Sequence, residues 1–126
     1  MKYLCMVFTD ERLLEQMPRE QLDSLLREHL ALDDELKGTG QFVHANALQP
    51  AHQAVTVRLR QGRVSVTDGP FAETKEQLTG FYLVEARDLN DAIQIAAKVP
   101  SARIGSVEVR PIWELGDAPR RFRTDA

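Results

Sequence analysis

An α+β fold, with two helices packed on one antiparallel sheet, is predicted by three observations. Six short segments have the apolar runs or the two-residue alternation of strands, and two longer segments repeat apolar residues every three or four positions, as helices do. Their order along the chain is β-α-β-β-β-β-α-β, so one helix follows the first strand and the other precedes the last. The length of 126 residues fits one domain.

The first part of the chain is expected to form a strand and a long helix. Residues 3–8 (YLCMVF) are apolar at every position, which is typical of a strand covered on both faces, and we expect the thiol of Cys5 to be buried. Residues 18–36 carry an apolar stripe at helical spacing: Leu22, Leu25, Leu26, His29, Leu32 and Leu36. Pro18 is tolerated in a first helical turn, and Gly38 and Gly40 are expected to end the helix.

Four strands are expected in the middle of the chain. Residues 42–48 (FVHANAL) form the first of them. Segments 55–60 and 64–67 alternate apolar and polar residues around Gln61-Gly62, which predicts a hairpin with one face in water. Residues 78–84 form the next strand, in which Gly80 indicates a bulge or the close approach of another backbone.

The last part of the chain is expected to form a helix, a strand and a tail. Asp88 is a suitable N-cap, and Asp91 stands three residues later, as in a capping box. Pro100 is expected to end this helix after Val99. Residues 104–112 then form the last strand, and residues 116–126 form a polar tail, loose or docked on a partner subunit.

These elements predict a ferredoxin-like sandwich of split βαβ units, expanded by the inserted hairpin. Two helices cover only one face of such a sheet. The first strand is apolar on its second face as well, through Leu4, Met6 and Phe8. A small domain rarely leaves such a face in water, so we expect a second copy of the chain to cover it, as a homodimer.

Composition and charge argue against several classes of protein. The formal net charge is −3, with 16 basic and 19 acidic residues, which argues against direct binding of nucleic acid. No apolar stretch is long enough for a membrane span, and the single cysteine and the lack of a signal peptide fit a cytoplasmic protein. The three histidines, His29, His44 and His52, have no metal-site spacing, and no Gly-rich phosphate loop is present, so no cofactor is expected.

Residues 68–76 (DGPFAETKE) are the most unusual segment. One interpretation is a loop between strands, in which Phe71 anchors the loop to the core and the charged side chains are solvated. The segment 68–100, followed by SVEVRPI at 106–112, resembles the YCII-related family in its DGPF subgroup. The resemblance covers residues 1 to about 113, so we divide the chain into a domain at 1–115 and the tail at 116–126.

The resemblance implies a ferredoxin-like fold that pairs into a dimeric α/β barrel. It also implies a His–Asp catalytic pair, with the histidine on the first helix, where His29 stands, and the aspartate before a proline after the second helix. Here that position is Val99, before Pro100, so the acid is missing. Members of the DGPF subgroup are found beside or fused to sigma-factor genes, which implies an accessory or regulatory setting in transcription.

Two functions are therefore predicted as alternatives. The first is a small-molecule-binding protein or cryptic enzyme with a polar pocket between the sheet, the first helix and the 68–76 loop. Its acid–base candidates are His29, Asp68 and Glu73. Its candidates for binding a small polar or anionic ligand are Lys75, Glu76, Glu108 and Arg110. The second is a non-catalytic module associated with a sigma factor. Independently of these two functions, Arg110 is expected either to bind the ligand or to pair, in a structural network, with Glu108 of a neighbouring copy or with Asp68 or Glu73.

Overall fold

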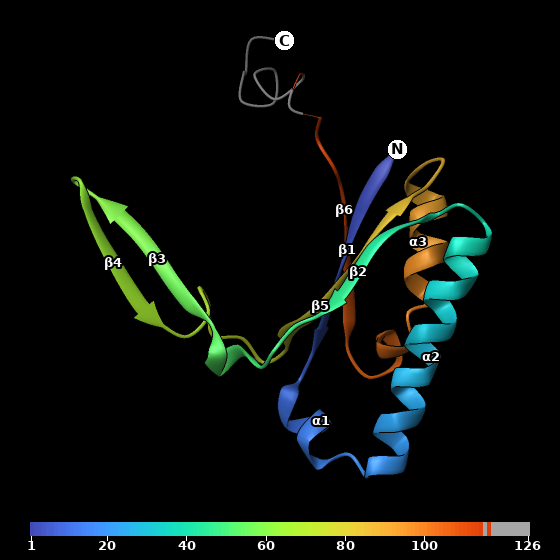
Figure 1. Ribbon diagram of the computed structural model, residues 1–126, viewed down its shortest axis with the longest axis horizontal. Coiled ribbons are helices and arrows are strands. Elements are labelled where there is room, and N and C mark those ends of the chain that lie inside the picture. Colours follow the sequence, from blue (N-terminus) through green and yellow to red (C-terminus); the bar gives the residue numbers. More distant parts are fainter. Residues whose placement is uncertain (115, 117–126) are drawn as a thin grey trace.

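The computed structural model describes residues 1–114 and 116 and has an α+β architecture (Figure 1). The core sheet has four antiparallel strands in the order β2-β5-β1-β6. They are β1 (Lys2–Thr9), β2 (Phe42–Ala47), β5 (Gln77–Glu85) and β6 (Ser106–Pro111). The helices are α1 (Glu11–Gln16), α2 (Arg19–Gly38) and α3 (Leu89–Ala97), with short 3-10 turns η1 (Ala51–Gln53) and η2 (Pro100–Arg103). The predicted α+β class and the two long helices are confirmed.

The core lies between one face of the sheet and the helices α2 and α3. Along β1 every second side chain is buried, so Tyr3, Cys5 and Val7 point toward the helices. They pack with Leu32 and Leu36 of α2 and with small or branched residues of α3 and its end: Ala92, Ile95, Ala96 and Val99. This is the two-layer packing that covers one face of an antiparallel sheet.

Helix α1 was not expected from the sequence. Asp10 caps it, because its Oδ1 accepts a hydrogen bond from the backbone N–H of Arg12 at 3.0 Å. The helix has only six residues and buries none of them, so it shows no apolar stripe. Helix α2 begins at Arg19, immediately after Pro18, and is 20 residues long, close to the predicted range.

Gly80 has both of the roles that the sequence indicated. The register of β5 against β1 shifts by one residue between Val7 and Phe8, because Val7 pairs with Gly80 and Phe8 pairs with Leu78. A Cβ atom at Gly80 would lie 2.9 Å from the backbone oxygen of Asn46. The glycine therefore allows β2 to approach β5 beside the bulge.

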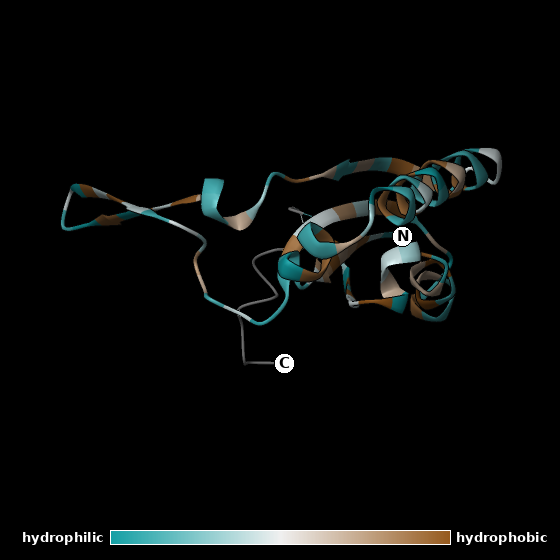
Figure 2. Ribbon diagram, turned by 90° about the horizontal axis from the view of Figure 1, so that it is seen from below, coloured by the Kyte–Doolittle hydropathy of each residue, from teal (hydrophilic) through white to brown (hydrophobic). Residues whose placement is uncertain are grey.

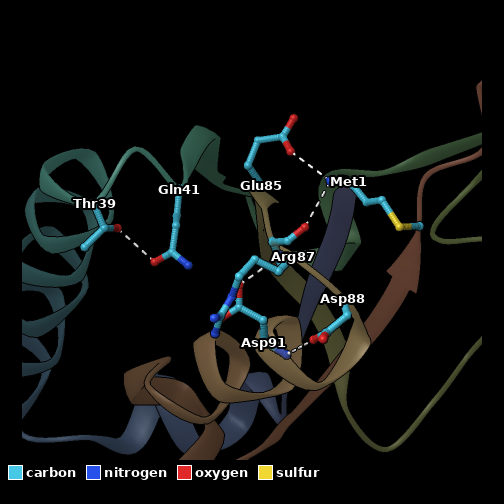
Figure 3. A network of polar contacts seen from close by, with 8 residues as sticks. Met1, Thr39, Gln41, Glu85, Arg87, Asp88 and Asp91 are labelled. Atoms are coloured by element: carbon cyan, nitrogen blue, oxygen red, sulfur yellow. Dashed lines mark hydrogen bonds and ion pairs between the residues drawn. The ribbon is translucent and has the colours of Figure 1, made fainter.

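The start of α3 is a network of backbone caps (Figure 3). Asp88 Oδ1 accepts from the N–H of Asp91 at 2.8 Å, as predicted for the N-cap. The Asp91 carboxylate does not reach back to Asp88. It accepts from the N–H of Arg87 at 3.0 Å, one residue earlier than in a standard capping box. Helix α3 ends at Ala97, two residues before the predicted end, and η2 follows it.

The hairpin of β3 (Val55–Arg60) and β4 (Arg63–Asp68) forms a sheet of its own. We call the segment Val55–Asp68 the arm. It projects from the body on the side of the core sheet away from the helices, in both views (Figures 1 and 2). One of its faces carries five exposed apolar side chains: Val55, Val57, Leu59, Val64 and Val66. The expectation that Phe71 anchors the following loop to the core is wrong, since this side chain is 82% exposed and lies under Arg58.

The second face of the core sheet has an apolar centre and polar edges. Leu4, Met6, Phe8, Phe81 and Leu83 are partly exposed on it, along β1 and β5. We call these five residues the open face. Ser106, Glu108 and Arg110 share this side of β6, while Val107 and Val109 pack against the core.

The predicted polar tail, 116–126, lies outside the described residues except for Gly116. Within the described residues, no helix combines the length and the apolar composition that a membrane span requires.

Candidate functional site

A cavity of about 610 Å³ lies between the helices α1 and α2 and the inner face of the sheet. Its walls are mainly apolar and include Leu14, Leu22, Leu25, Leu26 and Leu30. Gly80 and Ala45, both small, line the floor on β5 and β2. A cavity of this volume with apolar walls and a few polar groups is the usual form of a small-molecule site.

His29 is the polar centre of this cavity. Helix α2 presents it toward the sheet, where Nδ1 lies 2.5 Å from the hydroxyl of Tyr82 on β5. Its Nε2 lies 2.8 Å from Oγ of Ser101 in η2. Both hydroxyls are buried and both residues line the cavity. Because each hydroxyl can donate or accept, either neutral tautomer of the imidazole makes two hydrogen bonds.

Burial determines the charge of this group. Desolvation lowers the pKa of His29, and the nearby carboxylates of Asp33 and Glu28 offset this only in part. Burial also raises the pKa of the Tyr82 hydroxyl, with a smaller contribution from the charge of Asp33. At neutral pH the imidazole is therefore neutral and the phenol keeps its proton. One ring nitrogen donates to one hydroxyl, and the other accepts from the second.

Asp33 stands one helical turn after His29 and lines the same cavity. Its Oδ1 is buried and has no hydrogen-bond partner among the described residues. Burial raises the pKa of this carboxyl, and the charges of Lys37 and His29 lower it by less. The cavity thus contains an acid with unused hydrogen-bonding capacity beside a histidine.

Three of the predicted site residues meet elsewhere, on the other side of the sheet. Lys75, Glu76 and Glu108 line a second, more open hollow of about 510 Å³ next to Phe8. The Oγ of Ser106 donates to Glu76 Oε1 at 2.8 Å and so ties the loop to β6. The structure therefore does not bring these residues to His29, which lies on the helix side.

The other three predicted site residues, Arg110, Asp68 and Glu73, line neither cavity. The guanidinium of Arg110 pairs with Glu108 of its own strand at 2.6 Å, two residues away on the same face. The sequence predicted, as an alternative to ligand binding, a structural pairing with Glu108 of a neighbouring copy, Asp68 or Glu73, whereas the partner here is Glu108 of the same strand. Asp68 ends the arm and Glu73 lies exposed in the loop after it.

Tyr82 and Ser101, the partners of His29, were not among the predicted site residues. The alternation of β5 was a usable signal for Tyr82, because it points this side chain to the inner face with Val84. For Ser101 the signal was its place after Pro100, close to the position where the resemblance implied an acid. Val99 itself is a core residue, 1% exposed, and Ser101 makes the contact to the histidine.

In the described part of the chain, no three His, Cys, Asp or Glu side chains lie close enough together to hold a metal ion. His44 lies on the open side of the sheet, beside Phe81, with its Nε2 2.7 Å from the Asn46 amide. His52 lies in η1. The three histidines thus occupy separate places.

Comparison with known proteins shows matches over nearly the whole chain. The model of the YCII-related domain matches residues 1–116. An uncharacterised protein, R00369, from Rhizobium meliloti (strain 1021) is 34% identical over 123 residues, which are 94% of this chain and 99% of that protein. The match extends over the strands, the helices and the cavity described above, and the chain therefore belongs to the family of YCII-related domains.

Proposed function

We propose that the chain binds a small molecule in the cavity around His29 and moves a proton there by acid–base chemistry. The observation that carries the proposal is the imidazole held between the hydroxyls of Tyr82 and Ser101 at the wall of a large cavity. A neutral histidine near physiological pH is the usual general base of enzymes. Because both ring nitrogens are already hydrogen-bonded, a proton would pass between His29 and a bound molecule through one of the two hydroxyls.

This proposal differs from the predicted pocket in its residues. It keeps His29 and replaces the acids of the 68–76 loop by Tyr82, Ser101 and Asp33. The reason is position, because the loop contributes nothing to the lining of this cavity.

A fragment screen by protein NMR tests the binding site. Leu26 lines the cavity and Leu89 begins α3, and each is 50% exposed, so the two form a matched pair. Fragments that shift the amide signals of Ala45, Tyr82 and Ser101 should lose this effect in Leu26→Trp and keep it in Leu89→Trp. The proposal fails if no fragment shifts these signals, or if Leu26→Trp leaves the shifts unchanged.

We also propose that two copies pair through the open face. Leu4, Met6 and Phe81 support this, because they leave an apolar strip uncovered between polar edges. The arm supports it as well, since it extends on the same side of the sheet (Figure 1). Light scattering should give twice the mass of one chain for the wild type and for Leu89→Lys, and a lower mass for Met6→Lys. A wild-type mass of one chain would contradict the dimer.

An accessory role, including association with a sigma factor, is a second candidate function. The exposed apolar face of the arm favours it, because such a surface suits a protein partner. A pull-down from native extract compares the wild type with the double variant Val57→Asp, Val66→Asp. A partner captured only by the wild type supports this role, whereas recovery of the chain alone from both counts against it.

A further inference from the structure

The charged side chains that line the cavity around His29 are all acidic. They are Glu11 and Glu15 on α1 and Asp33 on α2, and no lysine or arginine among the described residues lines this cavity. An anion in an apolar cavity needs a cation or several donors to replace its water. The cavity offers carboxylates instead, so its electrostatics disfavour an anionic ligand.

The three carboxylates differ in what they already bind. Both oxygens of Glu11 accept from the backbone N–H of Ala51, at 3.0 and 3.2 Å, which holds α1 to η1. Glu15 lies exposed at the mouth. Asp33 is the exception, because its buried Oδ1 has no hydrogen-bond partner among the described residues. The nearest cation along the helix, Lys37, lies with Nζ 5.0 Å from the centre of the Phe42 ring and makes no ion pair with Asp33.

A carboxylate at the wall of an apolar cavity is unfavourable when no cation or donor lies beside it. An ammonium group bound in the cavity would place a positive charge beside Asp33, which lines it. Other walls of the cavity are aliphatic and include Leu26 and Leu30 of α2 and Leu48, which follows β2. They provide contact for an apolar group but no further charge.

We propose that the cavity takes a small apolar amine, whose ammonium group donates to Asp33 and whose apolar part lies between α2 and the sheet. This inference rests on the proposed function and specifies its ligand. It departs from the anionic ligand that the sequence suggested, because Lys75 and Arg110, on which that idea depended, lie outside this cavity.

Three compounds of one shape test the ligand class: benzylamine, benzyl alcohol and benzoate. In NMR titrations benzylamine should shift the amide signals of Ala45, Tyr82 and Ser101 at the lowest concentration, and benzoate should not shift them. Charge-assisted hydrogen bonds contribute about 1.5–3 kcal/mol, so Asp33→Asn should weaken benzylamine binding about tenfold or more. Asp34→Asn, which neutralises the exposed neighbouring acid, should leave it unchanged.

The outcomes separate this inference from the proposed function. If benzyl alcohol or benzoate shifts the cavity signals more readily than benzylamine, the cavity binds small molecules but the amine class is wrong. The same holds if Asp33→Asn leaves benzylamine binding unchanged. If none of the three compounds shifts these signals and the fragment screen is also negative, both proposals fail.

Discussion

Nδ1 of His29 lies 2.5 Å from the hydroxyl of Tyr82, a residue 53 positions away in the sequence. This contact joins the middle of α2 to the inner face of β5 at the wall of the cavity. The two rings are also nearly parallel, with an interplanar angle of 17° and centroids 6.0 Å apart. The polar centre of the site is thus part of the packing between helix and sheet, so changes to it should alter stability as well as binding.

Tyr82→Phe should lower the free energy of unfolding by about 1–3 kcal/mol, because Nδ1 of His29 loses its partner in a buried place. Tyr3→Phe is the matched control. Tyr3 is also buried on the inner face, but among the described residues its hydroxyl has a single, weak hydrogen-bond partner, the sulfur of Met1 at 3.9 Å. Its loss should cost less than the loss at Tyr82. Urea unfolding followed by circular dichroism measures both, and equal losses would contradict the assigned role of the Tyr82 hydroxyl.

Acid should destabilise the fold through His29. Burial lowers the pKa of this histidine in the folded state, so below about pH 6.5 the unfolded chain binds more protons. Stability that is present above pH 6.5 is therefore lost as the pH falls through this value toward the lowered folded pKa. His29→Gln should remove this part of the pH dependence, and His44→Gln, on the other side of the sheet, should retain it.

Asp33 acts in the opposite direction. Its pKa is raised by burial, so the folded chain binds more protons and stability falls as the pH rises above the ordinary aspartate value of 3.8. The contribution of His29 is therefore the difference between the wild type and His29→Gln in how the free energy of unfolding changes with pH. Urea unfolding from pH 5 to 7.5 measures it. Identical slopes for the two proteins would show that His29 is not held neutral by the fold.

The regular elements were predictable because their signals are local. The alternation of β3 and β4 and the stripe on α2 follow directly from side-chain periodicity. Helix α1 lacked such a signal, since it buries no residue and depends on the cap at Asp10. The end of α3 was placed two residues late because Pro100 begins a 3-10 turn after the helix has ended.

The candidate site was less predictable because it depends on contacts distant in sequence. The stripe on α2 identified His29, but nothing local placed Ser101, 72 residues away, against its Nε2. The charges of Glu108 and Arg110 drew attention to β6, and the sheet places them on the face opposite the cavity. The sequence predicted a pocket that joins them to His29, but the histidine lies on the other side of the sheet.

The thiol of Cys5 should be unreactive in the folded protein. It is 0% exposed in the core, and burial raises its pKa to about 11, so almost no thiolate is present at neutral pH. The Ellman reagent should release no thiolate dye from the native chain at pH 8 and one equivalent after denaturation in guanidinium chloride. Fast release from the native chain would mean that β1 opens readily or that the thiol is not buried.

Gly80→Ala should destabilise the protein, because its Cβ would lie 2.9 Å from the backbone oxygen of Asn46. The backbone of Asn46 cannot rotate away from the new Cβ as a side chain could, so β2 must move. Overpacking of this kind lowers the free energy of unfolding by about 1–3 kcal/mol. Gly38→Ala is the matched control. Gly38 ends α2 with nothing within 4 Å of an added Cβ, so alanine there should be neutral or stabilising by up to about 1 kcal/mol.

The same pair of variants also tests the shape of the cavity. Gly80 lines the cavity floor and Gly38 does not, so binding of fragments should weaken only in Gly80→Ala. Urea unfolding measures the stability of both variants, and NMR titration with a fragment that binds the wild type measures the binding. A Gly80→Ala variant with wild-type stability would show that β2 is not in close contact with β5. Unchanged binding in that variant would place the ligand away from the β5 bulge.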